Sequence, residues 1–561
     1  MHDHTLQDHT DFLVIGGGTA GAILATRLSS DPSRKVTLVE AGADTPPGSV
    51  PADIADTFPR AYSNPAYAWP GLTATGVAGS APRSFTQARV MGGGSSMMGM
   101  WALRGLAADY DGWRECGATG WGWSDVAPYF QRLQASEAAP GAFPIRRIER
   151  RDWPAYVQAL QKVAADCGYP GQPDINGSER DGFFAIPLSQ DGSVRGSSTH
   201  ACLTPAVRRR ENLQILAQTE VTALSGTGRE ISGARAMRQG ETISLTARQT
   251  ILCGGAIHSP VLLLRSGIGP AAELASLEFP VRIDLAGVGR NLQNHAGVNL
   301  GLTLAEPYRQ HRMLRNYGVA CMRVSSGLPS GEAGDLLLAF IGRTAMRPIG
   351  RSIAIAGVFL YAPTSRGAVT LRRASGALST DIRFNLLDTD ADRARIAHGV
   401  EVLLRLLNDE RLRDVFHEVF LLPATPPLHR LNRPGAWAAL QASLGHAALA
   451  AGRLPRRALL KMMLGKGRVM GREQISARAL EFNALLRESV TPLFHVAGTC
   501  AMGAQSDTSA VVDSQCRVRG VSGLRVADAS IMPRLPRANT FLPVAMIAER
   551  AADLILAGGD A

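Results

Sequence analysis

Three glycines near the start of the chain have the spacing of a phosphate-binding turn. Gly16, Gly18 and Gly21 follow an apolar run, and Glu40 lies nineteen residues after Gly21. In such a turn the first glycine makes the bend, the second lets backbone N–H groups approach a pyrophosphate, and the third allows close packing of the next helix on the strand. The amides and the dipole at that helix N-terminus favour negative charge. The spacing therefore predicts a site for the diphosphate of a dinucleotide.

A βαβ unit would position these glycines. Residues 12–15 and 36–39 are apolar runs typical of buried parallel strands, and the run between them is rich in alanine and leucine. Glu40 closes the second strand, where its carboxylate can accept hydrogen bonds from both ribose hydroxyls and would repel a 2′-phosphate, so NADP is disfavoured. A structural strand-to-helix turn is the alternative interpretation, because glycine-rich turns are common, and both FAD and NAD remain open on this motif alone.

The composition favours a large soluble enzyme. The 561 residues predict two or three domains, and the net charge of +11 is carried by mostly dispersed arginines without a nucleic-acid motif. Residues 1–10 lack the features of a signal peptide, and no apolar run approaches the roughly 20 residues that span a bilayer. The seven scattered cysteines form no CxxC pair, which argues against a disulfide framework or a metal site. We expect a cytoplasmic location and no nucleic-acid partner.

The rest of the chain contains further glycine turns and a region of different character. Residues 92–96 form a glycine and serine cluster, and residues 251–269 read as strand, glycine turn and helix. From about residue 298, five strands are predicted at 298–304, 335–341, 353–361, 368–371 and 381–386, in one mostly antiparallel sheet, with a helix at 391–407. Residues 423–478 read as a basic, irregular or helical insertion. Peripheral membrane contact by residues 453–478 is one interpretation, but a solvated helical face is favoured because the apolar face is short.

The C-terminal region carries the most specific motifs. Residues 493–503 hold His495 before a Gly-Thr turn, residues 523–533 hold Asp528, and residues 537–552 hold Asn539 before a closing helix. With the N-terminal unit and residues 92–96, 255–269 and 287–292, these ordered motifs resemble the glucose-methanol-choline (GMC) oxidoreductase family over essentially the whole chain. Residues 323–327, 384–387 and 538–540 are most similar to its branch of bacterial 5-hydroxymethylfurfural oxidases and aryl-alcohol oxidases.

The resemblance implies an α/β fold, α+β overall, in two domains. A Rossmann-like FAD-binding domain is assembled from the discontinuous segments 8–150, 195–297 and 490–561. A substrate-binding domain of residues 151–194 and 298–489 holds a mostly antiparallel sheet and helices.

The same resemblance implies FAD as cofactor and assigns site residues. His495 matches the active-site histidine and Asn539 the second member of its catalytic pair, whereas the competing His295 is expected to be structural or close to the flavin. The implied cofactor-binding positions are Gly16, Gly18, Thr19, Ala20, Gly21, Glu40, Ala41, Trp69, Arg89, Met91, Gly92, Gly93, Ser96, Met98, Gly99, Met100, Trp101, Val221, His258, Asp528, Ala529, Asn539 and Thr540.

Four positions depart from the family pattern. Met97 and Met98 stand where many relatives have asparagine, and Met97 cannot bond a flavin as the histidine of covalently flavinylated relatives does, which implies non-covalent FAD. Phe494 replaces a tryptophan of similar relatives, so we assign it to the substrate pocket. Asn294 replaces a common aspartate, with no expected effect on the chemistry.

Flavin-dependent alcohol oxidation needs a base for the hydroxyl proton while a hydride passes from the carbinol carbon to flavin N5. His495 suits the proton step, because histidine is mostly neutral at pH 7, and the amide of Asn539 can hold the substrate oxygen. A core histidine satisfied by a carbonyl is the alternative for His495. We expect a primary, aromatic or furanic alcohol as substrate and O₂ as oxidant, giving H₂O₂. A dehydrogenase using a quinone or another acceptor, a hydroxynitrile lyase, a light-driven decarboxylase and a non-enzymatic flavin-binding protein are the alternatives.

Overall fold

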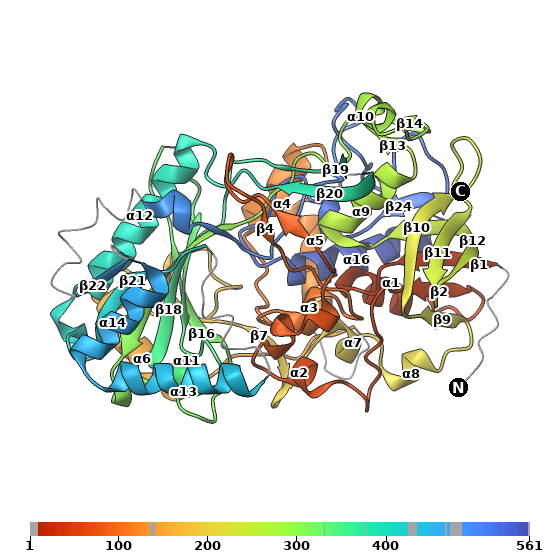
Figure 1. Ribbon diagram of the computed structural model, residues 1–561. Coiled ribbons are helices and arrows are strands. Elements are labelled where there is room, and N and C mark those ends of the chain that lie inside the picture. The colour runs from red at the N-terminus through yellow and green to blue at the C-terminus, as the bar shows by residue number, and fades with distance from the viewer. Residues whose placement is uncertain are drawn as a thin grey trace.

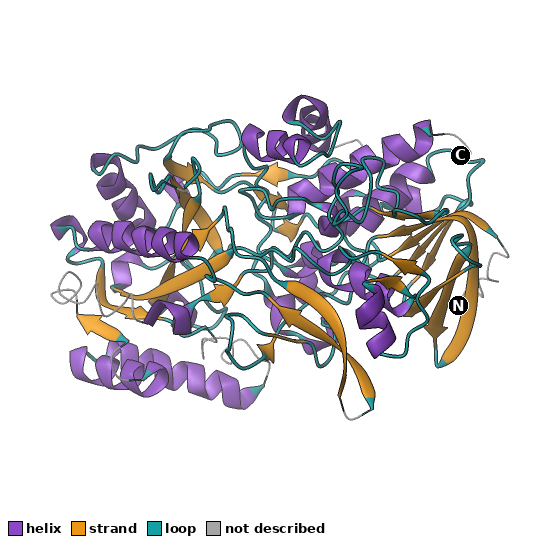
Figure 2. Cartoon of the chain, turned by 90° about the horizontal axis from the view of Figure 1, so that it is seen from above, coloured by secondary structure: helices purple, strands orange, loops and turns teal. Residues whose placement is uncertain are grey.

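The computed structural model describes residues 9–134, 141–329, 331–374, 376–424, 435–465, 468–471 and 485–558. Two large sheets lie at opposite ends of the molecule (Figure 1), and long loops and short helices fill the space between them. Figure 2 shows the same two sheets from above, with helices around both. This arrangement places the C-terminal residues of the chain close to its N-terminal βαβ unit, since β24 (Leu524–Val526) belongs to the same sheet as β1 (Thr10–Ile15).

The first sheet is a parallel sheet with an antiparallel extension. Its parallel part has the order β9 (Leu213–Leu216), β2 (Val36–Val39), β1, β12 (Glu241–Leu252) and β24. The first half of β12 pairs instead with β11 (Gly233–Arg238), which pairs with β10 (Thr219–Ser225). The predicted strands at residues 12–15 and 36–39 are confirmed. They are apolar at nearly every position because both of their faces are buried.

Three helices pack beside this sheet or on one another. They are α1 (Thr19–Leu28), α9 (Gly255–Arg265) and the closing helix α16 (Phe541–Ala557). Arg27 of α1 forms ion pairs with Glu549 and Asp553 of α16 at 2.5 and 2.7 Å. Because Glu549 is buried, this pairing fixes the C-terminal helix against the helix of the N-terminal βαβ unit.

The second sheet is antiparallel throughout. Its order is β22 (Val469–Gly471), β21 (Phe416–Leu421), β15 (Ala296–Leu304), β18 (Ile353–Leu360), β17 (Leu336–Ile341), β16 (Gly318–Val324) and β6 (Gly182–Ala185), and β23 (Thr491–Pro492) also pairs with β15. Helix α12 (Asp390–Leu407) packs on β17 and β18, and α6 (Ala155–Asp166) packs near β6. The mostly antiparallel sheet predicted from residue 298 onward is confirmed.

Two of the predicted strands do not belong to this sheet. Residues 368–371 and 381–386 correspond to β19 (Ala368–Ala374) and β20 (Ala377–Arg383), which form a separate two-stranded sheet. The prediction that they join the large sheet was wrong. The backbone N–H of Val369 donates to the carbonyl of Gly289 at 2.7 Å, so the loop at residues 287–292 takes the hydrogen bonds that another strand would need.

Within the described residues, the basic insertion contains two helices and the short strand β22. Helices α13 (Ala436–Ala450) and α14 (Arg453–Leu464) cover the outer side of the second sheet (Figure 1). Two basic residues of that insertion, Lys466 and Arg472, lie outside the described residues. No helix within the described ranges is long and apolar enough to cross a membrane.

The remaining elements are short. The helices are α2 (Ala52–Ala55), α3 (Gly94–Met97), α4 (Ala107–Glu115), α5 (Trp123–Gln134), α7 (Ser198–Ala201), α8 (Pro205–Arg208), α10 (Ala271–Ser276) and α11 (Ile349–Ser352). The strands are β3 (Thr73–Ala74), β4 (Arg83–Ser84), β5 (Ile145–Arg146), β7 (Leu188–Asp191), β8 (Val194–Arg195), β13 (Ile268–Gly269) and β14 (Ile283–Asp284).

Candidate active site

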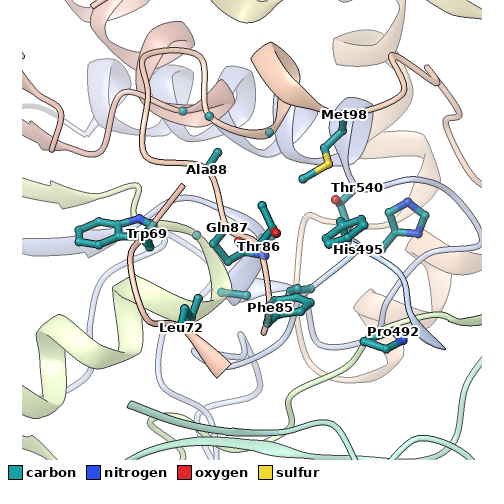
Figure 3. Close-up of a pocket in the computed structure, with 18 of the residues that line it drawn as sticks. Trp69, Leu72, Phe85, Thr86, Gln87, Ala88, Met98, Pro492, His495 and Thr540 are labelled. Carbon is teal, nitrogen blue, oxygen red and sulfur yellow. The ribbon is translucent and has the colours of Figure 1, made fainter. Parts of the chain in front are cut away.

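A cavity of about 1050 Å³ runs between the two sheets, from the glycine turn to His495. Figure 3 shows part of its lining, with Trp69 and His495 on opposite sides. Helices α1, α9 and α16 all contribute first-turn residues to its lining. Unpaired N–H groups and the positive ends of the α1 and α9 dipoles therefore face the end of the cavity formed by the glycine turn, whereas α16 begins directly after Asn539 and Thr540. That end is suited to a diphosphate.

A side chain has no room at Gly16, Gly21 or Gly93. A Cβ atom on Gly21 would lie 1.8 Å from the carbonyl oxygen of Gly16, and one on Gly93 would lie 2.9 Å from Cα of Gly18. The loop before α3 thus approaches the first turn backbone to backbone. Gly16 and Gly93 also have φ angles of +108° and +54°, which favour glycine. Two chain segments that are far apart in sequence therefore form one backbone-lined cradle.

Glu40 is held at the end of β2 by both of its oxygens. The N–H groups of Gly17 and Gly42 donate to them at 2.8 Å each. Burial raises the pKa of Glu40, while these two hydrogen bonds oppose the rise. Glu40 lines the cavity, and each of its carboxylate oxygens keeps a further lone pair, which is the capacity that ribose hydroxyls would need.

An aromatic platform lies at the far end of the cavity from His495. The rings of Trp69 and His258 stack with centroids 4.1 Å apart, and the guanidinium of Arg89 lies 5.2 Å from the Trp69 ring centre. Burial lowers the pKa of His258 to about 3, so this imidazole is neutral at pH 7. Val221 also lines the cavity. A flat, neutral surface with a cation beside it suits a purine base.

A buried arginine holds α3 and the residue that follows it. Arg195 is 2% exposed and donates to the carbonyl oxygens of Met98 at 2.5 Å, Ser95 at 3.3 Å and Ile54 at 3.0 Å. Burial lowers the pKa of Arg195 to about 10, so it remains charged at pH 7. This cation holds that segment in one shape along the cavity wall.

Asp528 connects two sides of the site. It accepts hydrogen bonds from the N–H of Gly255 at 2.8 Å, the hydroxyl of Ser259 at 2.6 Å and the N–H of Ser530 at 2.8 Å. Burial raises its pKa, and these three donors oppose the rise. Asp528 thereby fixes the start of α9 beside the loop that carries Ala529.

His495 and Asn539 meet at the other end of the cavity. The amide Nδ2 of Asn539 lies 2.7 Å from Nε2 of His495, and the Tyr361 hydroxyl donates to Asn539 Oδ1 at 3.1 Å. On its other side, Nδ1 of His495 lies 2.9 Å from Nδ1 of His295. The His295 ring stacks on Tyr361 with centroids 4.3 Å apart. Four side chains from four separate segments of the chain thus form one hydrogen-bonded row.

This row assigns the His495 tautomer. Because Asn539 Oδ1 accepts from Tyr361, Nδ2 is the donor toward His495, and Nε2 of His495 must be the acceptor. Burial lowers the pKa of His495 to about 3, so the ring is neutral and carries its proton on Nδ1. That proton is donated to His295 Nδ1. The Nε2 lone pair therefore faces the amide of Asn539, at the position where a substrate hydroxyl would compete for it.

Aromatic side chains surround the cavity near His495. Phe494 lies against Phe85 with centroids 5.8 Å apart at 21°, and against Tyr62 with centroids 5.2 Å apart at 63°. Figure 3 shows Phe85 on the same side of the cavity as His495. Edge and face contacts of this kind favour a flat apolar substrate.

Most residues predicted from the sequence line this one cavity. They are Gly16, Gly18, Thr19, Ala20, Glu40, Ala41, Trp69, Arg89, Gly93, Met98, Gly99, Met100, Trp101, Val221, His258, Phe494, His495, Asp528, Ala529, Asn539 and Thr540. Four others, Gly21, Met91, Gly92 and Ser96, are not part of its lining. The Ser96 hydroxyl instead donates to the Met91 carbonyl at 2.8 Å behind the loop, where both residues are fully buried.

Some residues of the site were missed from the sequence. Tyr62, Phe85 and Tyr361 stand in segments without a recognisable motif, so no signal in the sequence pointed to them. His295 was expected to be structural or close to the flavin, and the structure places it in contact with the candidate base. The tract at residues 292–295, Leu-Gln-Asn-His, was the only available sign of that position.

Comparison with known proteins defines the class. Residues 10–297 match the N-terminal domain of the GMC oxidoreductase family, and residues 363–548 match its C-terminal domain. The chain belongs to the GMC oxidoreductases, and it is an FAD-dependent enzyme acting on CH–OH donors. The cavity fits FAD, since it combines a glycine cradle at helix N-termini, an acidic residue at the end of β2 and an aromatic platform.

Particular relatives cover nearly the whole chain. The 5-(hydroxymethyl)furfural oxidase of Methylovorus sp. (strain MP688) is 35% identical, over 97% of this chain and 98% of its own. The mitochondrial choline dehydrogenase of Homo sapiens is 30% identical, over 98% and 90%. Among solved structures, pyridoxine 4-oxidase from Mesorbium loti has a TM-score of 0.75 at 26% identity, covering 97% of this chain and 98% of that one.

Proposed function

We propose that this protein oxidises a primary alcohol with an aromatic or furanic ring to the aldehyde and transfers the electrons to O₂, giving H₂O₂. The observation that carries the proposal is the fixed tautomer of His495, whose unprotonated Nε2 faces the same cavity as Phe494 and Phe85. The similar Methylovorus protein is named 5-(hydroxymethyl)furfural oxidase, which supports a furanic alcohol as the substrate.

The chain's own residues account for the proton step. His495 Nε2 takes the hydroxyl proton of the substrate, and the Asn539 amide donates to the substrate oxygen as it gains negative charge. Tyr361 holds that amide in the donating orientation, and His295 receives the hydrogen bond from Nδ1 of His495. FAD, when bound, supplies the acceptor for the hydride of the carbinol carbon.

The cofactor is proposed to be held without a covalent bond. Gly18, Glu40, Trp69 and Arg89 would hold its ADP part, and the loop of Met98–Trp101 would lie along its ring. Met97 is fully buried outside the cavity lining and has no group that could bond a flavin. Acid precipitation should therefore leave the yellow colour in the supernatant and a colourless protein pellet.

We also propose the division into an FAD-binding and a substrate-binding domain, which is supported by the segments that supply the strands of each sheet. Every strand of the first sheet falls in residues 8–150, 195–297 or 490–561, the segments assigned to FAD binding. The strands of the second sheet fall in residues 151–194 and 298–489, apart from the first two residues of β15 and the short β23. The cytoplasmic location stays a prediction.

The substrate class is tested by anaerobic reduction of the enzyme's flavin with a panel of benzylic, furanic, aliphatic and polyol alcohols. We expect the benzylic and furanic alcohols to bleach the flavin fastest, with aldehyde formed in equal amount. A panel in which choline or a polyol is the fastest reductant would contradict the proposed substrate class. Unchanged alcohol and a flavin that stays yellow would contradict oxidation altogether.

A dehydrogenase that uses a quinone or another acceptor is the second candidate. It is favoured by relatives named choline dehydrogenase and glucose dehydrogenase [FAD, quinone], both 30% identical to this chain. Stopped-flow mixing of the reduced enzyme with O₂ separates the two candidates. Reoxidation within the turnover time supports the oxidase, and reoxidation only by an added quinone supports the dehydrogenase.

A further inference from the structure

Helices α13 and α14 expose an unusual amount of apolar surface. Within the described ranges, ten large hydrophobic side chains are exposed, and five of them lie on these two helices. They are Trp437 at 70%, Leu440 at 48%, Leu444 at 62%, Leu454 at 83% and Met462 at 78% exposed. Scattered single hydrophobic residues on a surface are ordinary, but a cluster of this kind marks a contact surface.

The exposed residues of α13 form a stripe that the core does not use. Trp437, Leu440 and Leu444 recur at helical spacing on one side of the helix. Ala442 and Leu449 of the same helix are buried in a small core with Ile349, so α13 is already anchored by another face. The outward stripe therefore contributes little to folding.

The charge around this stripe has one sign. Residues 435–465 contain four Lys or Arg and no Asp or Glu. Arg456 is buried against Glu418 at 2.5 Å, and Arg457 lies 3.7 Å from the same carboxylate. Arg453 and Lys461 are exposed, and neither forms an ion pair with another described residue. Two cations of this segment are thus directed to solvent beside the apolar side chains.

Further arginines border α13. Arg347 donates to the carbonyl of Gly435, the residue before α13, at 3.3 Å. His446 of α13 lies 3.0 Å from the Ser352 hydroxyl, next to Arg351, and the positive charges of Arg309 and Arg351 both help to lower its pKa after the effect of burial. Glu306 is the acidic residue near this group. The basic character therefore extends from the two helices to the loops beside them.

We propose that the exposed face of α13 and α14, which we call the α13–α14 face, docks on a lipid bilayer that contains anionic lipids. Aromatic and aliphatic side chains enter the boundary of headgroups and acyl chains, while lysine and arginine interact with anionic headgroups. A second copy of this chain fits less well, because a symmetric contact would bring the same cations together. In Figure 1, α13 lies at the periphery of the molecule, beside the second sheet.

Vesicle flotation of the FAD-loaded enzyme tests this proposal. We expect binding to vesicles with 30% phosphatidylserine, and little binding to pure phosphatidylcholine. Because each surface cation contributes about fivefold to partitioning on an anionic membrane, neutralising two of them (R453Q with K461Q) should weaken binding about thirtyfold. The matched control neutralises two exposed arginines elsewhere, R209Q with R229Q, and should keep nearly full binding.

The apolar part has its own matched pair of variants. Trp437→Ser should abolish most of the binding, whereas Met237→Ser, which removes a 40% exposed side chain on β11, should not. Both side chains are exposed, so alcohol oxidation without vesicles should stay at the wild-type rate in both variants. The other six tryptophans are buried or half-buried, so brominated lipids should quench mainly the emission of Trp437.

Three results would overturn the proposal. They are no flotation with anionic vesicles, equal binding to neutral vesicles, or a concentration-dependent dimer that W437S dissolves while vesicle binding is absent. The last result would assign the α13–α14 face to a second copy of the chain. None of these outcomes bears on the chemistry at His495, which the alcohol panel tests separately.

Discussion

Replacing His495 by alanine is the most direct test of the active site. The Nε2 atom of His495 lies 2.7 Å from the amide nitrogen of Asn539. General-base catalysis by a positioned side chain contributes about 10²–10⁴-fold. We therefore expect H495A to slow anaerobic flavin reduction by at least about a hundredfold.

The two partners of this contact should act as one unit. Asn539→Ala removes the donor to the substrate oxygen. Removing such a donor to a developing oxyanion lowers the rate of the chemical step by about 10²–10³-fold. The double variant should be much less impaired than the product of the two single effects, because each side chain depends on the other for position. Asn212→Ala is the control, since this side chain donates to the carbonyl oxygens of Ser29, Asp31 and Arg34 and stays outside the cavity lining.

The pH dependence adds an independent check. With a His495 pKa of about 3, the base is already unprotonated throughout pH 5–9. The limiting rate of flavin reduction, measured by stopped flow at saturating alcohol, should therefore be nearly constant over that range. A rate that falls below pH 6.5 with the titration of a single group would refute the claim that burial keeps His495 neutral. A loss of less than tenfold in H495A would refute its role as base.

Three further predictions concern the supporting residues. Tyr361→Phe removes one neutral hydrogen bond to Asn539, and we expect stopped-flow reduction to slow about 2–10-fold with an unchanged pH profile. Gly93→Ala would place a Cβ 2.9 Å from Gly18 Cα at a positive φ, so the purified variant should contain less FAD, measured by the ratio of absorbance at 450 and 280 nm. Burial lowers the pKa of His258 to about 3, so between pH 6.5 and 3 the unfolded chain binds one more proton than the folded chain. The free energy of unfolding should therefore decrease by about 1.4 kcal/mol per pH unit as the pH falls through this range. In His258→Asn, the free energy of unfolding measured with urea should depend less on pH.

Local patterns explain how far the sequence could predict the fold. The runs at residues 12–15 and 36–39 are apolar because both faces of a central parallel strand are buried, and the turn between them needs glycine for steric reasons. Both constraints act within one βαβ unit, so they are visible in a single stretch of sequence. The predicted helix at residues 391–407 is likewise confirmed as α12, with Thr389 as its N-cap.

Long-range pairing explains what the sequence could not predict. The hairpin of β19 and β20 has the composition of a strand pair, and only the contact of Val369 with Gly289 decides which part of the molecule it joins. Similarly, Phe85 and Tyr62 reach Phe494 across more than 400 positions of sequence. Aromatic residues in irregular segments show no periodicity, so their convergence on one pocket was not predictable from spacing.

The contact between His295 and His495 shows why burial and tautomer must be considered together. Burial lowers the pKa of both rings, which makes His495 a weak base at equilibrium but leaves it neutral and ready at any physiological pH. Once Nε2 accepts a proton, the imidazolium still donates through Nδ1 to the lone pair of neutral His295, so its positive charge is shared along an N–H···N bond inside a buried site. His295 thus stabilises the charged form of His495, which arises during proton transfer, more than the neutral form. An interaction that is stronger in the transition state than in the ground state lowers the barrier to proton transfer, and it does not tighten the binding of the alcohol.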